Sequence, residues 1–249
     1  MTKTRKLEAF LVHVLISVAI FIALYLYIKY ELYPGKLFDI DGGKQGLIIV
    51  ALVDLVLGPL LTLIIYKKGK RGLTRDLWLI GTIQLSCLGA GMYITVGERP
   101  LAVILSYDGF HSVGTSSLEL YGKDKDMYSR WPGDTPKWLY VQLPNDPKER
   151  MKLQLSQMTS GPLYMQDDLL FALDDKNIDP AIYATKLNAI IRIYPNMAEN
   201  IKQIDEKLNK SGDGFSYIPL IGKYGQRYVI LDNTRREIIG ALPTDQCKE

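Results

Sequence analysis

Three long apolar runs near the start of the chain constrain its fold more than any other feature. They cover residues 10–28, 47–66 and 77–96, and none of them contains a lysine or an arginine. Each run holds about 20 residues, which at about 1.5 Å of rise per residue matches a hydrocarbon core about 30 Å thick. The first run exceeds the apolar part of a signal peptide, so we interpret it as a retained helix. The sequence therefore predicts a membrane domain of three transmembrane helices within residues 1–99.

Basic residues in the short loops predict which way these helices cross the membrane. Lys3, Arg5 and Lys6 precede the first run. The loop between the second and third runs carries a larger basic cluster: Lys67, Lys68, Lys70, Arg71 and Arg75. We assign this cluster to topology and to contact with lipid headgroups. Because basic loops stay in the cytoplasm, we expect a cytoplasmic N-terminus in a bacterial inner membrane, with residues 100–249 in the periplasm.

Residues 100–249 have the patterning of a folded domain outside the membrane. Acidic residues, prolines and helix-forming polar residues dominate here, although the whole chain is 47% hydrophobic with a formal net charge of +3. Short apolar runs predict strands, and Asp-Pro pairs predict helix starts. The predicted strands cover residues 101–105 and 138–143, and the predicted helices cover residues 146–160, 182–193 and 196–210.

Three further runs of strand length lie near the end of the chain. They cover residues 215–221, 227–232 and 237–242, with turn-forming residues between them. Strands joined by such short turns pair antiparallel with their neighbours in sequence. The predicted fold class is therefore a membrane α-helical domain with three transmembrane helices, followed by a periplasmic α+β domain with a terminal antiparallel β-meander.

Asp54 is the most unusual residue of the apolar runs, because it places an ionisable group well inside the second one. A carboxyl group in hydrocarbon costs about 2–3 kcal/mol, so it normally faces water or a polar partner. Two interpretations stay open: Asp54 contacts a polar side chain of its own bundle, or it contacts a helix of a partner protein. Within the bundle, the candidate partners are His13, Gln84 and Ser86.

The residues after Asp54 predict an irregular second helix. Pro59 cannot donate a hydrogen bond to the carbonyl of Leu55, and its ring crowds that carbonyl. Gly58 permits close helix packing, and Thr62 can hydrogen-bond backward along the helix. We therefore expect the helix to bend beside Asp54.

The residue pattern argues against catalysis and against a resident metal or cofactor. An intramembrane aspartyl enzyme needs two carboxyl groups that share a proton, and only Asp54 lies deep within a run. His13 and His111 are predicted on opposite sides of the membrane, so they cannot share a metal ion. The sequence also has no glycine-rich phosphate loop. We therefore expect a non-enzymatic protein that holds no metal and no cofactor.

The stretch from residue 38 to residue 66, FDIDGGKQGLIIVALVDLVLGPLLTLIIY, resembles the type IV pilin accessory proteins of the TfpX/TfpZ kind. The basic loop, Arg75-Asp76-Leu77, Gln84 and Arg99-Pro100 extend this resemblance to about residue 110. The resemblance implies partner-binding residues and no catalytic ones. The implied partner-binding residues are Asp41, Gly42, Gly43, Asp54, Gly58, Pro59 and Thr62.

The same resemblance implies a function. It is that of an inner-membrane accessory factor for type IV pilus biogenesis, which binds or stabilises a cognate pilin before assembly and modulates pilin level and piliation. The expected partners are this pilin, membrane lipids and the pilus assembly platform, with no nucleic acid. The three helices would hold the apolar helix of the pilin, and the periplasmic domain would contact its head.

Two alternative functions stay open at this point. The chain could be a membrane-anchored protein that senses a periplasmic ligand, or a protein associated with a transporter. A sensor needs a cytoplasmic effector, and the inside of the predicted topology offers only a short terminus and one loop. Transport activity in reconstituted vesicles would favour the transporter alternative.

Overall fold

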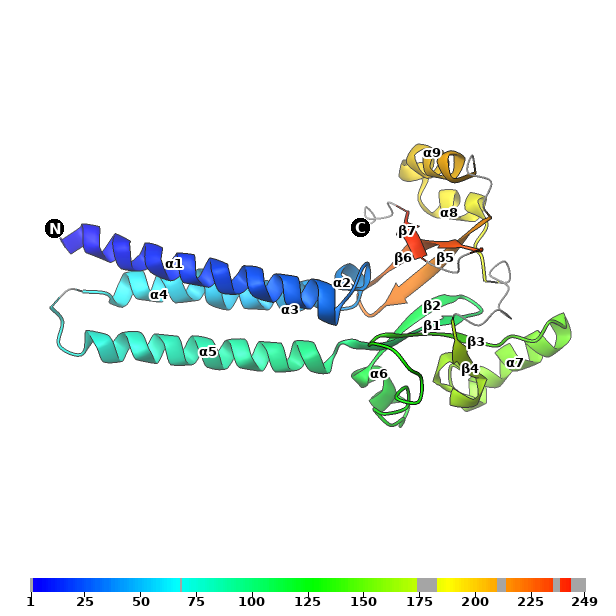
Figure 1. Cartoon of the computed structure of the whole chain (residues 1–249), viewed down its shortest axis with the longest axis horizontal. Helices are drawn as coiled ribbons and strands as arrows, with labels where there is room; N and C mark the ends of the chain where they lie inside the picture. The colour runs from blue at the N-terminus through cyan, green and yellow to red at the C-terminus, as the bar shows by residue number, and fades with distance from the viewer. Residues whose placement is uncertain (1, 68, 174–182, 210–213, 235–237, 243–249) are drawn as a thin grey trace. The chain divides into compact units, whose positions relative to one another are not determined.

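The computed structural model describes residues 2–67, 69–173, 183–209, 214–234 and 238–242. The chain divides into two compact units, Met1–Arg99 and Pro100–Glu249. The first unit is helical, and the second combines helices with a sheet (Figure 1).

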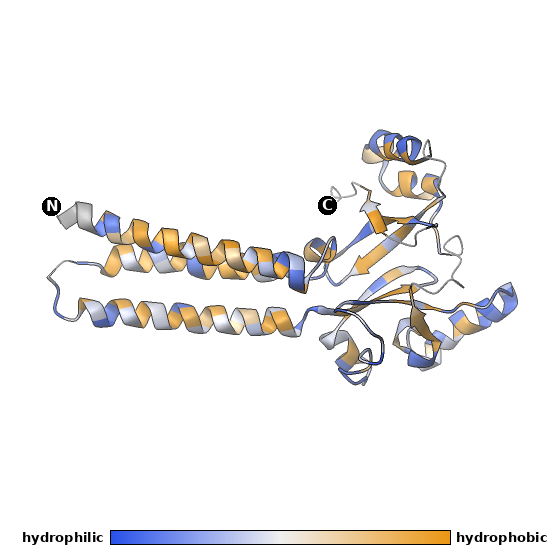
Figure 2. Cartoon of the chain, in the orientation of Figure 1, coloured by the Kyte–Doolittle hydropathy of each residue, from blue (hydrophilic) through white to orange (hydrophobic). Residues whose placement is uncertain are grey.

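Three helices that are long and apolar enough to cross a membrane make up most of the first unit. They cover Lys6–Leu32, Gly43–Ile65 and Leu73–Gly97, with 27, 23 and 25 residues. The three predicted helices are therefore confirmed, and each extends beyond the start of its apolar run. Figure 2 shows apolar residues along most of their length, with polar residues more frequent on α5 (Leu73–Gly97).

The second of these helices changes geometry along its length. α3 (Gly43–Ala51) leads into a π-helical turn, η2 (Leu52–Leu57), and then into α4 (Gly58–Ile65). Pro59 lies in the first turn of α4, directly after the wider π turn, where its missing N–H removes one helical hydrogen bond. The irregularity expected beside Asp54 takes the form of this π-helical turn.

Thr95 of α5 joins the elements at the end of the unit away from the N-terminus. α1 (Thr2–Tyr27) continues into a π-helical turn, η1 (Ile28–Leu32), and the short α2 (Leu37–Ile40) precedes α3. The hydroxyl of Tyr33, which follows η1, donates a hydrogen bond to the carbonyl of Thr95 at 3.0 Å.

α3 also approaches α5 closely at the same threonine. A Cβ at Gly46 would lie 2.7 Å from Oγ1 of Thr95, so the approach depends on the absence of a side chain. Small residues commonly permit such close packing between membrane helices. Tyr33 and Gly46 together tie the first loop and the second helix to α5.

A seven-stranded mixed sheet forms the framework of the second unit, in the order β4-β3-β1-β2-β5-β6-β7. Its strands are β1 (Pro100–Ser106), β2 (Gly109–Gly114), β3 (Lys137–Val141), β4 (Leu170–Ala172), β5 (Phe215–Gly222), β6 (Gly225–Asp232) and β7 (Ile238–Ala241). β1 pairs antiparallel with β2 and parallel with β3. Residues 102–105 of β1 are fully buried, as expected for a central strand covered on both faces.

The prediction of a domain with helices and strands is confirmed, but the predicted terminal meander needs correction. β5, β6 and β7 do pair antiparallel in sequence order. β5 also pairs parallel with β2, with Phe110 opposite Leu220 and His111 opposite Ile221, so the three strands are one end of a larger sheet. A local turn pattern cannot indicate a pairing between residues so far apart in sequence.

The described residues of the second unit also form four α-helices: α6 (Thr115–Leu120), α7 (Pro147–Ser160), α8 (Leu187–Ile193) and α9 (Ala198–Asn209). α7 begins as predicted because Oδ1 of Asp146 accepts a hydrogen bond from the backbone N–H of Lys148 at 2.9 Å. α8 is shorter than predicted, since the N–H of Thr185 bonds to the carbonyl of Tyr217 at 2.7 Å instead of joining a helix. The predicted start of that helix at residues 179–182 lies outside the described residues.

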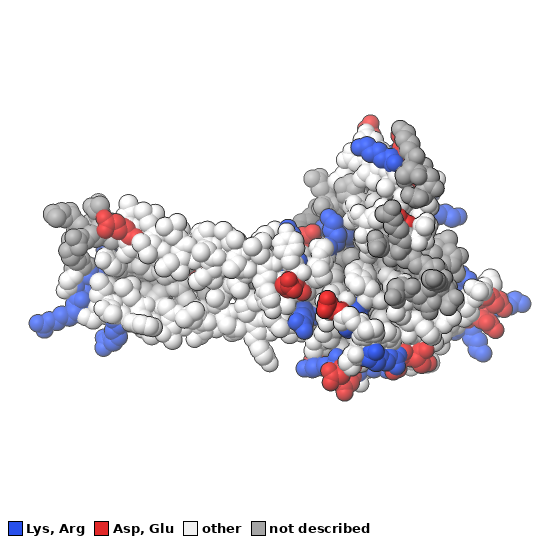
Figure 3. Space-filling view, viewed as in Figure 1, with Lys and Arg blue, Asp and Glu red and all other residues white. Residues whose placement is uncertain are grey.

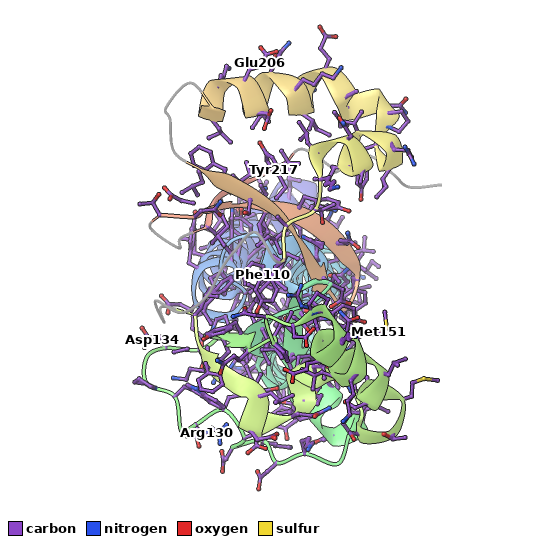
Figure 4. All side chains as sticks on the ribbon, turned by 90° about the vertical axis from the view of Figure 1, so that its right-hand side faces the viewer. Phe110, Arg130, Asp134, Met151, Glu206 and Tyr217 are labelled. Carbon is purple, nitrogen blue, oxygen red and sulfur yellow. The ribbon has the colours of Figure 1, made fainter. Side chains whose placement is uncertain are left out.

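α8 and α9 pack against β5 and β6. The buried residues of this core are Ile190, Ile201, Tyr217, Tyr228, Ile230 and Leu242. Figure 4 shows Tyr217 between the sheet and α9, with Glu206 on the outer side of the helix. The hydroxyl of Tyr217 donates to Oδ1 of Asp205 at 2.6 Å, which satisfies the polar end of a buried ring.

Candidate functional site

A groove of about 450 Å³ lies among the three membrane helices. α1 and α5 both pack against the second helix, and the groove lies between them over its η2–α4 part. Its walls are mostly apolar, but five polar side chains line it: His13, Ser17, Asp54, Thr62 and Gln84. This groove holds a concentration of polar groups in an otherwise apolar part of the molecule, and we take it as the candidate site.

Helical spacing explains how these residues reach one place. Side chains three or four residues apart share one face of an α-helix. His13 and Ser17 are four apart on α1, Asp54 lies eight residues before Thr62, and Gly81 lies three before Gln84 on α5. The sequence thus directs one face of each helix to the groove.

Asp54 is buried, with 6% of its surface exposed. The amide of Gln84 donates to its Oδ1 at 3.2 Å. The hydroxyl of Ser17 lies beside the same carboxyl group. Even so, Oδ2 has no hydrogen-bond partner of acceptable geometry among the described residues. The carboxyl group is therefore bonded to Gln84 through Oδ1, while Oδ2 is buried near the Ser17 hydroxyl without a bond of acceptable geometry.

His13 and Thr62 form a second polar contact across the groove. Nδ1 of His13 and Oγ1 of Thr62 are 2.7 Å apart, which joins α1 to α4. Thr62 is 4% exposed, so this contact is shielded. The backward hydrogen bond expected of Thr62 along its own helix is replaced by this contact between helices.

Gly58 makes the approach of α5 possible. A Cβ at Gly58 would lie 1.8 Å from Nε2 of Gln84, so any side chain there would displace the amide that holds Asp54. Pro59, next in sequence, is buried as well. Among the expected partners of Asp54, Gln84 makes the contact, whereas Ser86 is exposed.

The predicted residues Asp41, Gly42 and Gly43 lie elsewhere, at the start of the second helix. Gly42 has φ of 114°, a left-handed conformation that favours glycine, and it caps α3. A Cβ at Gly43 would lie 2.8 Å from Cδ2 of Phe38. Eleven residues of helix, about 16 Å, separate Gly43 from Asp54, so these three residues form a tight turn outside the groove.

The basic loop lies at the end of the helical unit near the N-terminus. Figure 3 shows blue side chains there, and the visible face of the helices beyond them is largely uncharged. Nζ of Lys70 and Oδ2 of Asp76 are 2.5 Å apart in an exposed ion pair, which contributes little stability. Lys67, Arg71 and Arg75 are also described, whereas Lys68 lies outside the described residues.

Sequence reasoning missed Ser17. A serine hydroxyl in an apolar run can bond to the backbone of its own helix. Ser17 therefore does not indicate a polar site in the way that the carboxyl group of Asp54 does. Its spacing of four from His13 was the available signal. Burial to 1% and its place beside Asp54 show that it belongs to the site.

His111, the other histidine, has a local role in the second unit. Its ring stacks on Tyr164 with centroids 4.3 Å apart, and Nε2 lies 2.8 Å from Oδ1 of Asp108. Burial raises the pKa of Tyr164 above its usual value. The described residues contain no group of three potential ligands that could hold a metal ion.

These features define a class: a protein with three helices long and apolar enough to cross a membrane, a polar groove among them and a mixed-sheet domain. No protein-family model and no solved structure matches the chain. The chain is 32% identical over 240 residues to the fimbrial assembly protein of serogroup E1 from Dichelobacter nodosus. This similarity covers 94% of the chain and 93% of that protein, so the chain belongs to the same fimbrial assembly protein family.

Proposed function

We propose that the chain is an inner-membrane accessory factor for type IV pilus biogenesis, of the TfpX/TfpZ kind. The similarity to a fimbrial assembly protein over nearly the whole of both chains carries this proposal. The resemblance in residues 38–66 adds the narrower assignment to pilin accessory factors. The factor acts by binding and performs no reaction of its own.

The proposed orientation has the N-terminus in the cytoplasm and the second unit in the periplasm. The basic residues of the loop between α4 and α5 support it, since such loops are retained on the cytoplasmic side. An odd number of spanning helices then brings Pro100 and the sheet that follows to the other face of the membrane.

The proposed partner is a cognate pilin that waits in the inner membrane before assembly. Binding to the accessory factor stabilises this pilin and so raises pilin level and piliation. The polar groove among the helices supports a role in the membrane. The mixed-sheet domain supplies a second surface, on the same side of the membrane as the head of the pilin.

A pull-down after crosslinking in cells tests the proposal. The tagged full-length protein is recovered from gently solubilised native membranes and probed for pilin, in cells that make either the cognate pilin or a non-cognate one. We expect recovery of the cognate pilin alone, and lower pilin levels in cells that lack the factor. Recovery of the factor without either pilin, with unchanged pilin levels, would refute the proposal.

A further inference from the structure

We infer that the groove among α1, η2–α4 and α5 binds one transmembrane helix, and that this helix donates a hydrogen bond to Oδ2 of Asp54. The inference rests on the proposed function, because it identifies the helix as the apolar membrane helix of the pilin. It adds the site, the depth in the membrane and the polar group that the partner must supply.

The open oxygen of Asp54 is the first support. Oδ1 is bonded to Gln84 at 3.2 Å, and the Ser17 hydroxyl lies beside the carboxyl group, but Oδ2 is buried without a hydrogen bond of acceptable geometry among the described residues. A polar atom buried in hydrocarbon without a partner is costly, so polar groups inside membranes normally pair. Asp54 lines the groove, and its Oδ2 can accept one more donor from a helix that packs there.

The unfilled groove wall is the second support. A Cβ at Gly81 would meet nothing within 4 Å, although Gly81 faces the groove. Ile16 on α1 and Leu85 on α5 line the same groove and are 56% and 66% exposed. The volume of about 450 Å³ falls within the range of protein binding pockets, so it accommodates several side chains of a partner.

The environment selects a helix as the occupant. Inside hydrocarbon, a polypeptide that faces lipid must satisfy its backbone internally, so a single spanning segment is helical. A lipid acyl chain would fill the apolar part of the groove, but it carries no donor for Asp54. A helix with one hydroxyl, amide or amine side chain fills the groove and pairs with the open oxygen.

The position of the groove also defines which part of the partner binds. The groove extends from Ala9 and Tyr66, near the basic loop, to Ile20 and Asp54. It therefore occupies the half of the bundle that is cytoplasmic in the proposed orientation. A pilin whose head lies outside presents the N-terminal half of its helix at this depth, and the donor side chain belongs there.

Site-specific photo-crosslinking tests this inference in native membranes. A benzophenone amino acid replaces Leu85 in the groove or, as a matched control, Leu79 on the same helix. Both leucines are largely exposed, at 66% and 60%, but only Leu85 lines the groove. We expect an adduct between position 85 and the pilin helix, identified by mass spectrometry, at a yield about tenfold above that at position 79.

A second pair of variants tests the groove by filling it. Gly81→Leu adds bulk inside the groove, and Gly89→Leu adds the same bulk on α5 outside it. Neither glycine has an atom within 4 Å of its Cβ position, so both sites have room for the start of a side chain. Immunoblots of the two variants show whether each is made and inserted at the wild-type level. We expect Gly81→Leu to reduce pilin recovery strongly, and Gly89→Leu to leave it unchanged.

The outcomes separate the inference from the proposed function. Three results would refute binding of the pilin helix in the groove. They are equal adducts at positions 79 and 85, adducts with lipid only, and full pilin recovery by Gly81→Leu. In each case, pilin recovered through crosslinks elsewhere in the chain would leave the proposed function standing. Absence of pilin from every crosslink and from the wild-type pull-down would remove both.

Discussion

The side-chain amide of Gln84 occupies the space that a side chain at Gly58 would fill, since a Cβ there would lie 1.8 Å from Nε2. The two residues therefore act as one unit in the packing of α4 against α5. This pair explains why a glycine precedes the proline of the second helix. It also allows a test in which a substitution at Gln84 removes the steric clash that a substitution at Gly58 creates.

Gly58→Ala is expected to destabilise the helical unit. The new methyl group displaces the amide of Gln84 and breaks its hydrogen bond to Asp54, at a cost of about 1–2 kcal/mol. In a Gln84→Ala background the same change meets no obstacle, so its cost falls to nearly zero. Unfolding of the four proteins in detergent measures both values. Equal costs of Gly58→Ala in the two backgrounds would contradict the described packing.

Asp54→Ala is expected to lower pilin level several-fold while the variant itself is made normally. The substitution removes both carboxyl oxygens, and with them the bond to Gln84 and the open acceptor. Asp54→Asn retains one acceptor oxygen and is the matched control, with an intermediate effect. Immunoblots for pilin and for the factor in the same cells measure the result. Unchanged pilin and piliation in Asp54→Ala would remove Asp54 from the mechanism.

The orientation is tested by cysteine labelling of two matched exposed lysines. Lys36→Cys lies between the first two helices, and Lys70→Cys lies between the second and third, in a chain whose own Cys87 and Cys247 are replaced by serine. A reagent that does not cross the inner membrane should label position 36 in intact spheroplasts. It should label position 70 only after the membrane is opened. The reverse pattern would invert the proposed orientation.

Tyr217 should make the second unit sensitive to alkaline pH. Burial, followed by the hydrogen bond to Asp205, raises the pKa of Tyr217 above its usual value. A tyrosine in the unfolded chain loses its proton at about pH 10, whereas the folded chain keeps it, so stability is full below about pH 10 and is lost above it. Thermal unfolding of wild type between about pH 8 and about pH 11 should show this loss.

Tyr217→Phe supplies the control for the alkaline effect. Phenylalanine keeps the buried ring but has no proton to lose, so the variant is less stable at neutral pH and loses less stability at alkaline pH. A wild type and a Tyr217→Phe variant with the same pH dependence would show that other groups, such as Tyr228, dominate. Burial also raises the pKa of Tyr228.

Run length and apolar composition were sufficient to predict the three helices, because a helix that crosses a membrane satisfies its own backbone and depends little on distant residues. A single carboxyl group in an apolar run was sufficient to single out Asp54, because an ionisable group is costly in hydrocarbon wherever its partner lies. Its contact with Gln84 was one of three candidates that the sequence left open. The structure selects Gln84 by the packing of α5 at Gly58.

Features that depend on distant residues were not predictable in this way. β2 and β5 pair through residues such as His111 and Ile221, and no local pattern links them. Ser17 joins Asp54 only when α1 packs beside η2, and serine is unremarkable in a membrane helix. The tight turn at Gly42 was recognised as part of a motif, but its separation from the groove required the structure.

The contacts of Tyr33 and Gly46 with Thr95 hold the helices together at one end, away from the groove. In the proposed mechanism, the residues that maintain the fold are therefore different from the residues that select the pilin. During evolution, Ile16, Gly81 or Leu85 can be substituted as the sequence of the pilin helix changes, while the contacts at Thr95 are kept. Specificity for the pilin can therefore change through substitutions in the groove, while the contacts at the other end of the helices stay conserved to keep the fold.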